Sequence, residues 1–350
     1  MKLISFTPPF AALSILLFLW AIPFAAKAQP DLSDWSVEAL LEASTAGDAN
    51  AMTYLATNYL EGIGTDANPD LAAQWFKRAA EGGDSYGMAM TGYLYEHGIS
   101  YSQNGAEAFV WYQRAADAGS RLGIGNLGYA YQSGLGVEVD LEKAVVLYRQ
   151  AADLGHTNSQ NNLAIAYRQG LGVEADPAEA VRWFTLASEQ GHIDAMANLG
   201  YQYEVGAGVA QDFTKAFDLY LRSAEAGGKL GLFNLAYLYD LGEGTAENPS
   251  QAAHWYAEAV KEGDAPAMAY LGLLHLNGRG VPQNDTEAAR LFQKSADLGD
   301  ADGMAFLGYM FENGFGVEQN LETAKKYYLE AAGMGQEFAL NGLENMALND

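Results

Sequence analysis

The chain has 350 residues, 49% of them hydrophobic, so it can bury a large core. It carries 44 acidic and 19 basic side chains, a net charge of −25 that disfavours nucleic acid and anionic lipid as partners. The absence of cysteine excludes disulfides, thiolate metal sites and cysteine nucleophiles.

The first 28 residues have the order of a secretory signal peptide, which we place at 1–28. A basic Lys2 precedes the apolar run Phe10–Trp20, and Ala26-Lys27-Ala28 supplies a small-x-small cleavage site. A retained membrane anchor is the alternative, but the run is short for a membrane span. We expect a mature chain that begins near Gln29, has no stable membrane insertion and lies in the periplasm or outside the cell, as in Gram-negative-type bacterial export. Losing two lysines and no acid would bring its net charge to −27.

Residues 29–48 form an N-terminal capping segment, in which Trp35–Ala46 predicts a single helix. Two columns of glycine then recur every 36 residues. The first column is Gly47, Gly83, Gly119, Gly155, Gly191, Gly227, Gly263, Gly299 and Gly335, and the second is Gly62, Gly98, Gly134, Gly170, Gly206, Gly242, Gly278 and Gly314. They predict eight repeats: 49–84, 85–120, 121–156, 157–192, 193–228, 229–264, 265–300 and 301–336.

Each repeat divides into two helices, because both glycine columns fall where a helix ends in a left-handed residue. The second helix of every repeat is preceded by an Asn or Asp that can cap it: Asn68, Asn104, Asp140, Asp176, Asp212, Asn248, Asn284 and Asn320. Asp176 and Glu179 predict a capping box. In the third repeat we expect helices over Leu122–Ser133 and Leu141–Leu154. No segment alternates like a strand, so the fold is predicted to be all-α.

The packing residues recur with the same period. The first helix of a repeat carries Leu followed by Gly or Ala, as at Leu127 and Leu199, and the second carries Ala followed by an aromatic pair, as at Ala180 and Trp183-Phe184. Small residues allow close helix approach, and each pair leaves an apolar face that only its neighbours can cover. Residues 337–350 predict a C-terminal capping helix.

This pattern resembles the Sel1-like repeat, a longer relative of the tetratricopeptide repeat. The family motif is matched by AMANLGYQYEVGAGV at Ala195–Val209 and by KAVVLYRQAADLG at Lys143–Gly155. The resemblance implies a right-handed α-solenoid superhelix with capping helices at both ends, and a role in protein–protein interaction. Ser100-Tyr101 replaces the usual Gly-Val, so we expect a different loop there.

The candidate binding residues lie on the helix face opposite the motif residues, which lines the concave groove in solenoids of this kind. An asparagine can donate and accept hydrogen bonds at once, and a tyrosine combines apolar area with a polar tip. The predicted binding residues are Asn126, Asn162, Asn198, Asn234, Tyr93, Tyr129, Tyr201, Tyr237 and Tyr309. The alternative is that these asparagines bond only each other or water, and that the tyrosines pack the neighbouring repeat.

Two further sets of polar residues admit a functional and a plain interpretation. The recurring acids could favour a cationic ligand or simply be solvated: Glu96, Glu204, Asp240 and Glu312. His156 and His192 share one repeat position, but two ligands are too few for zinc, so we interpret them as exposed surface residues. We predict no catalytic residue, no metal site and no cofactor.

Two functions from different classes follow. The first is an exported scaffold that binds a protein or extended peptide, with cationic character as one option, for envelope regulation or host interaction. The second is a hydrolase of β-lactams or cell-wall material, suggested only by cysteine-rich relatives whose paired cysteines this chain lacks. We favour the scaffold, a non-enzymatic monomer that does not bind nucleic acid.

Overall fold

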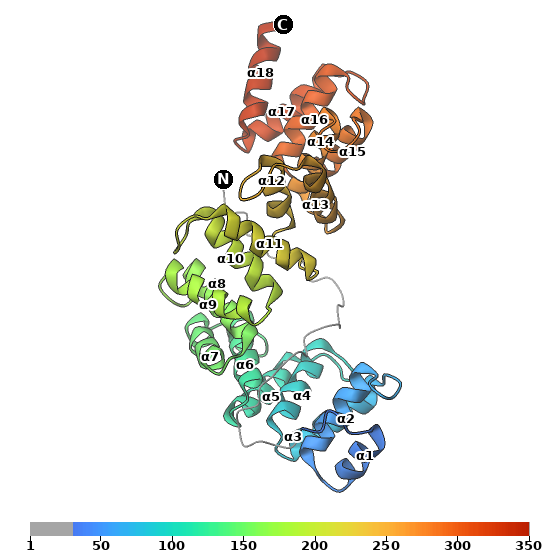
Figure 1. The fold of residues 1–350 in the computed structure, drawn as a ribbon, viewed down its shortest axis with the longest axis vertical. Coiled ribbons are helices and arrows are strands. Elements are labelled where there is room, and N and C mark those ends of the chain that lie inside the picture. The colour runs from blue at the N-terminus through green and yellow to red at the C-terminus, as the bar shows by residue number, and fades with distance from the viewer. Residues whose placement is uncertain (1–30, 350) are drawn as a thin grey trace. The chain divides into compact units, whose positions relative to one another are not determined.

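The computed structural model describes residues 31–349, so the predicted signal peptide lies outside the described residues. Within 31–349 it contains 18 α-helices and no strand, which confirms the all-α fold (Figure 1). We call the first helix of each repeat an A helix and the second a B helix. The A helices are α2 (Ala49–Glu61), α4 (Ser85–His97), α6 (Arg121–Ser133), α8 (Thr157–Gln169), α10 (Ile193–Val205), α12 (Leu232–Leu241), α14 (Ala265–Asn277), α16 (Ala301–Asn313) and α18 (Glu337–Asn349). The B helices are α1 (Val37–Thr45), α3 (Pro69–Glu81), α5 (Gly105–Asp117), α7 (Leu141–Asp153), α9 (Pro177–Glu189), α11 (Phe213–Glu225), α13 (Pro249–Lys261), α15 (Asp285–Asp297) and α17 (Leu321–Gly333).

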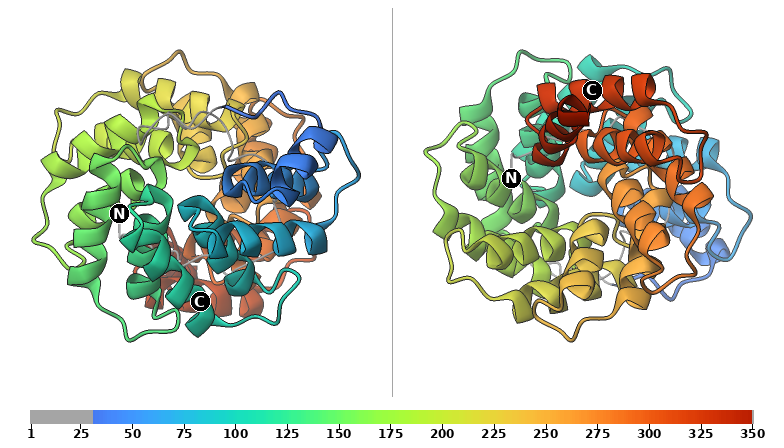
Figure 2. Two further views of the ribbon diagram at one scale, coloured as in Figure 1. Left: turned by 90° about the horizontal axis from the view of Figure 1, so that it is seen from below. Right: turned by 90° about the horizontal axis from the view of Figure 1, so that it is seen from above.

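The described residues form two compact units, which divide between Gly87 and Met88. In the first unit, α1 packs against α2 and α2 against α3. In the second, every helix from α5 onward packs against the next helix in the chain, so the repeats form a solenoid (Figure 1, Figure 2). No described helix is both long and apolar enough to cross a membrane.

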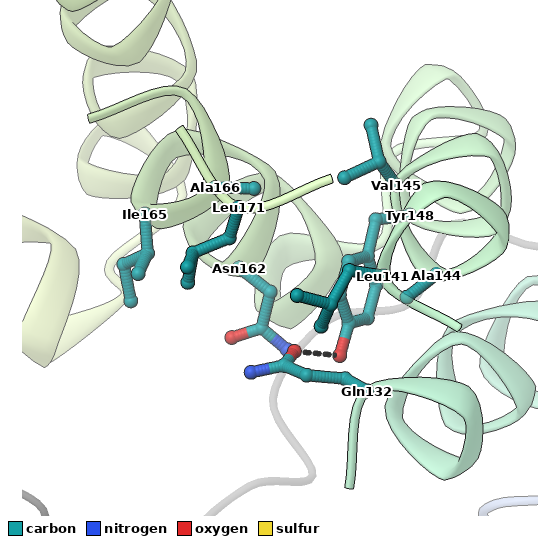
Figure 3. A pocket seen from close by; sticks show the side chains of 9 residues that line it. All are labelled: Gln132, Leu141, Ala144, Val145, Tyr148, Asn162, Ile165, Ala166 and Leu171. Carbon is teal, nitrogen blue, oxygen red and sulfur yellow. Dashed lines mark hydrogen bonds between the residues drawn. The ribbon is translucent and has the colours of Figure 1, made fainter. Parts of the chain in front are cut away.

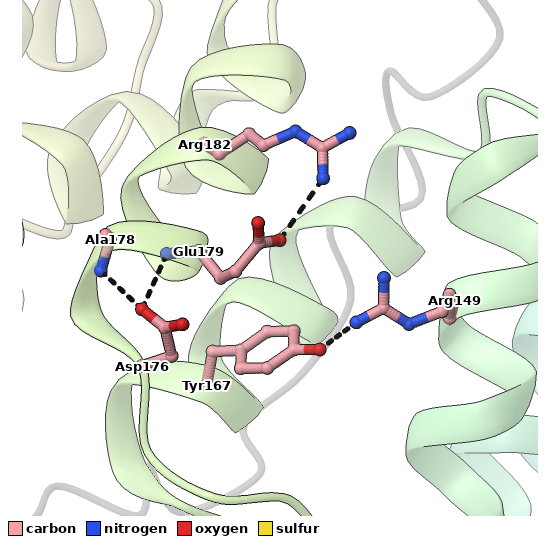
Figure 4. A network of polar contacts seen from close by, with 6 residues as sticks. All are labelled: Arg149, Tyr167, Asp176, Ala178, Glu179 and Arg182. Carbon is pink, nitrogen blue, oxygen red and sulfur yellow. Dashed lines mark hydrogen bonds and ion pairs between the residues drawn. The ribbon is translucent and has the colours of Figure 1, made fainter.

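Each B helix begins at its predicted cap. All eight Asn and Asp side chains accept a hydrogen bond from a backbone N–H in the first turn. The predicted capping box at α9 is wrong, as Figure 4 shows: Asp176 accepts from Ala178 and Glu179, but the Glu179 carboxylate pairs with Arg182 at 3.2 Å. The backbone N–H of Asp176 is unavailable to Glu179 because it donates to the Tyr167 carbonyl at 2.9 Å.

One A helix starts late because its cap is missing. At the equivalent position Asp264 and Asp300 cap α14 and α16 with their carboxylates, whereas Gly228 has no side chain. The A helix that follows, α12, has 10 residues instead of the usual 13 and starts after Gly231, which has a left-handed φ of 83°. A single uncapped position therefore removes the first turn of α12.

The loop between A and B helices contains a glycine that touches the preceding repeat. At Gly208, with φ of 74°, a Cβ would lie 2.1 Å from the Pro177 carbonyl oxygen at the start of α9. At Gly208, glycine adopts the left-handed backbone without strain and leaves room for the close approach. Ser100 holds this position in the second repeat with φ of 58°, so the expectation of a different backbone at this residue is wrong.

Candidate functional site

The A helices form the candidate binding side of the second unit. Among the described helices, α14 also contacts α16 and α16 contacts α18, while successive B helices make no comparable contact. Elements that approach each other lie on the shorter side of a curved stack, so the A helices from α14 to α18 form its inner side, and we assign the equivalent A helices of the other repeats to the same side by their shared repeat position. The predicted Asn and Tyr residues all belong to A helices.

In each of the eight repeats, a buried aromatic ring of the B helix forms the joint between neighbouring A helices. In α7 the Tyr148 ring is fully buried against Gly128 of α6, where a Cβ would lie 2.9 Å from the ring. The glycine of the Leu-Gly motif thus makes room for the ring. The equivalent rings are Phe76, Tyr112, Tyr148, Phe184, Tyr220, Tyr256, Phe292 and Tyr328.

Where the ring is tyrosine, its hydroxyl usually donates to a polar side chain near the end of the preceding A helix. Tyr148 donates to Gln132 Oε1 at 2.6 Å (Figure 3), and Tyr220 donates to Glu204 Oε2 at 2.6 Å. The same bond joins two further pairs, Tyr112 to Glu96 at 2.5 Å and Tyr328 to Glu312 at 2.7 Å. Three of the four recurring acids are therefore neither simply solvated nor free, because each accepts a buried hydroxyl.

Burial changes the acidity of these groups in a consistent direction. It raises the pKa of the Tyr148 and Tyr220 hydroxyls, so both stay protonated and can donate at neutral pH. Burial also raises the pKa of Glu204, against the opposing effect of the Tyr220 hydrogen bond. In the Tyr220–Glu204 pair, a protonated hydroxyl therefore donates to a carboxylate that is partly removed from water.

Two of the predicted asparagines lie beside the same hydroxyls on the following A helix. Asn234 Nδ2 donates to the Tyr220 hydroxyl at 2.8 Å, and Asn162 lies across a shallow pocket from the Tyr148 hydroxyl. An amide has two N–H donors and a carbonyl, so the bond of Asn234 leaves part of its capacity unused. The side chain of Asn126 makes no hydrogen bond to any residue that the structure describes.

Asn198 differs because the ring before it is Phe184, which has no hydroxyl. Arg168 lies over the Phe184 ring, with its guanidinium carbon 5.5 Å from the ring centre, and donates to Asn198 Oδ1 at 2.8 Å. Asn198 Nδ2 then donates to Asn161 Oδ1 at 3.3 Å. Asn198 therefore bridges α8 and α10 directly.

The predicted tyrosines are all half-buried, and some of them belong to aromatic clusters. Tyr237 lies 5.8 Å from Tyr270 and 6.0 Å from Phe233, while Tyr93 stacks on His97 at 4.1 Å. Tyr309 contacts Phe315 and Phe338, with ring centres 5.8 and 5.9 Å away. Tyr129 and Tyr201 pack against the core from the same face.

The sixth repeat breaks the tyrosine pattern. Asp240, the equivalent of Glu204, pairs with Arg279 at 3.2 Å, and Arg279 also pairs with Glu247 at 2.8 Å. The fully buried Tyr256 hydroxyl is left without a hydrogen-bond partner among the described residues. Tyr270 stands here in place of asparagine, 5.8 Å from the Tyr256 ring.

A shallow pocket lies beside the Tyr148 joint, and Figure 3 shows its lining. Asn162 and Ile165 of α8 face Gln132 and Tyr148 across it. The pocket has a volume of about 10 Å³, room for one water molecule and not for a small organic substrate.

Neither aligned histidine is exposed, so their prediction as exposed surface residues is wrong: His192 is a buried helix cap, and His156 is half-buried and makes no capping hydrogen bond. His192 Nδ1 accepts from the Ala195 N–H at 3.2 Å, and His156 Nδ1 lies 2.8 Å from Ser159 Oγ. Burial, with Arg121 and His192 nearby, lowers the pKa of His156 to about 4. Within the described residues no group of three or more His, Cys, Asp or Glu side chains is arranged to hold a metal ion.

The comparisons with known proteins agree with this architecture. A family model of the Sel1 repeat matches residues 49–84, 85–120, 123–156, 157–192, 193–228, 230–264, 265–300 and 301–336. Among solved structures, a protective antigen present in uropathogenic Escherichia coli strains and displaying an SLR fold is 31% identical with a TM-score of 0.75, over 90% of this chain and 68% of that one. A Sel1 repeat protein from Oxalobacter formigenes is 28% identical with a TM-score of 0.58, over 88% and 89% of the two chains. The comparison with curated proteins gave no match.

Proposed function

Because the chain belongs to the Sel1 repeat family, we propose that it is an exported scaffold that binds an extended segment of a partner protein along the inner side of its A helices. Sel1 repeat proteins are generally protein-interaction scaffolds, and their fold is typically non-catalytic. For this chain we add that it is exported, that the partner binds along the A helices, and that the Asn and Tyr side chains of these helices make the contacts.

The observation that carries the proposal is the row of half-buried Asn and Tyr side chains on successive A helices. Asn126 keeps its whole hydrogen-bonding capacity, and Asn234 keeps part of its own. Neighbouring helices are about 10 Å apart, and an extended peptide rises about 3.3 Å per residue, so one A helix meets about every third peptide residue. Amides spaced in this way suit a peptide backbone of any sequence.

The acidic surface supports a partner that is basic or neutral on average. The net charge of −25 draws cationic segments toward the protein at low ionic strength. We expect such binding to weaken as salt rises, since exposed charges are screened within about 8 Å at 0.15 M.

Selection from a synthetic library of random ten-residue peptides tests the binding side. The variant Asn126→Ala/Asn162→Ala removes two inner amides, and Gln150→Ala/Gln251→Ala removes two exposed amides from B helices as a matched control. Peptides selected by the wild-type protein should bind the inner variant at least about tenfold more weakly, a change of about 1.4 kcal/mol, and the control unchanged. Failure to select any peptide, or equal loss in both variants, would contradict the proposal.

Export is tested separately. Expression of the full chain in a Gram-negative host should yield a protein in the periplasmic or extracellular fraction whose first residue lies near Gln29. A chain that keeps residues 1–28 and stays in the cytoplasm would remove the export part of the proposal and leave the binding part standing.

A further inference from the structure

Arg168 is the one cation in a repeat position that otherwise holds acids, amides or leucine in the second unit. The residues at this position are Glu96, Gln132, Arg168, Glu204, Asp240, Leu276 and Glu312. The acids and the glutamine in it accept tyrosine hydroxyls or pair with Arg279. Arg168 follows Asn162 and Ile165 on α8, so it borders the candidate binding side.

The charge of Arg168 is not neutralised within the part of the chain that the structure describes. Its one hydrogen bond goes to the neutral amide of Asn198, and no carboxylate lies within ion-pair distance. Arg279, by contrast, pairs with two carboxylates. A guanidinium has five N–H donors and does not lose its proton in proteins, so four donors and a full charge remain.

The immobilised geometry of Arg168 distinguishes it from a free surface arginine. The Phe184 ring lies beneath the guanidinium, and Asn198 is itself held by Asn161. The side chain is half-buried, and burial lowers its pKa, which shows that its surroundings stabilise the charge less than water does. A fixed, partly desolvated guanidinium binds a carboxylate through two parallel hydrogen bonds.

We infer that Arg168 is a carboxylate-binding subsite on the inner side and binds one acidic group of the bound peptide. The inference rests on the proposed function for the peptide itself. The equivalent position on the next A helix is Glu204, about 10 Å away by helix spacing, so a peptide residue about three positions from the acid should be basic or neutral. The carboxylate can come from an Asp or Glu side chain or from the peptide's own C-terminus.

The test uses the random ten-residue library in two forms, with an amidated and with a free carboxyl terminus. Wild-type protein should enrich Asp or Glu at one position of the amidated peptides if a side chain binds, and should prefer the free form if the terminus binds. Arg168→Gln should lose that preference about tenfold and still select peptides. Arg182→Gln removes the same charge from the exposed side of α9 and should retain it.

A second readout separates this inference from the proposed function. The Nε–Hε signal of Arg168 is followed by NMR while N-acetyl-aspartate methylamide is added to the whole protein. A saturating shift, absent for Arg182, supports the subsite even if no peptide is selected. Three results would overturn the inference: selected peptides show no acidic preference, the Arg168→Gln variant keeps that preference, or the Arg168 signal does not shift. In the first two cases the proposed peptide scaffold still stands.

Discussion

The middle of the second unit, from α7 to α12, and its C-terminal part, from α13 to α16, fill the same helical framework with different chemistry. In the middle, the ring of Tyr220 joins Glu204 and Asn234 through two hydrogen bonds. In the C-terminal part, the equivalent ring is Phe292, and the matching positions are Leu276 and Phe306. Phe306 lies 5.3 Å from Phe292 with its ring tilted, so this joint is apolar throughout.

The two joints show how the ring sets what its neighbours must supply. A buried hydroxyl requires an acceptor and tolerates an additional donor, whereas a buried phenyl ring requires neither. The asparagine at 234 thus has a structural reason to be present, and any role in binding uses the capacity that remains. On the candidate binding side, the middle of the unit carries amides and one cation, while the C-terminal part carries aromatic rings.

The largest effect is expected for Phe292→Tyr, which places a hydroxyl in the apolar joint. The new hydroxyl would be buried between Leu276 and Phe306 with no acceptor, and we expect a loss of about 3 kcal/mol in unfolding free energy from the unpaired group and overpacking together. Urea denaturation followed by circular dichroism measures it. Adding Leu276→Glu supplies the acceptor found at the Tyr220 joint, so the double variant should recover much of the loss; no recovery would refute the joint as described.

The two parts should also respond to pH in opposite directions, because His156 and His192 begin A helices in the middle and Asp264 and Asp300 begin them in the C-terminal part. Burial lowers the pKa of His156 to about 4, below its ordinary value, so the unfolded chain binds the proton more readily and stability falls as pH drops from about 6.5 to about 4. Burial raises the pKa of Asp264 and Asp300, so the folded chain binds these protons more readily than the unfolded chain. The stability that this protonation contributes is lost as pH rises through the folded pKa values.

Comparison of wild type with His156→Asn, which removes the titrating imidazole and places a polar amide at the start of α8, isolates the histidine effect. We expect wild type to lose about 2 kcal/mol between pH 7 and pH 4.5 on account of this residue, and the variant to lose correspondingly less. His254→Asn, at an exposed position of α13, is the control and should behave as wild type. The same loss in both variants would show that His156 is not the source.

Removal of a satisfied hydroxyl should have a smaller effect. Tyr220→Phe breaks the bonds to Glu204 and Asn234, and we expect a loss of about 1–2 kcal/mol because both partners are only half-buried and can turn to water. The midpoint of urea unfolding provides the measurement. A loss below the error of the fit would mean that the joint contributes packing alone.

The smallest effect is expected where the hydroxyl already lacks a partner. Tyr256→Phe removes a buried group that has no hydrogen bond within the described chain, so stability should stay within about 0.5 kcal/mol of wild type or rise. A clear loss would indicate a partner for Tyr256, such as an ordered water, that makes the sixth repeat resemble the others.

The fold followed from the sequence because its signals are local. Two glycine columns and one column of caps predicted helices at Leu122–Ser133 and Leu141–Leu154, and the structure has them at Arg121–Ser133 and Leu141–Asp153. The late start of α12 could have been predicted as well, since Gly228 stands where other repeats carry Asp, Ser or His.

The joints were harder to predict because they connect residues 14 and 16 positions apart on three different helices, a separation that no helix period suggests. The signal was present nonetheless: the ring is phenylalanine where the preceding A helix has Leu276, and tyrosine where it has Glu204 or Glu312. The acids near the ends of the A helices and the rings of the B helices each recur as a column of their own. Taken one column at a time, the sequence does not reveal that they pair, and the acids are then expected to be solvated or to face a cationic ligand.

In the part of the chain that the structure describes, helices pack mainly against near neighbours in the sequence, and this has a consequence for how the protein folds. Contacts of short sequence separation close small loops, so the search for them is fast, and any hairpin with one formed neighbour can extend the ordered region in either direction. If one complete repeat of 36 residues were deleted, the two repeats on either side would meet through helix faces that have the same repeat positions. The molecule is therefore suited to changing length by whole units during evolution, with the reach of its binding side growing or shrinking accordingly.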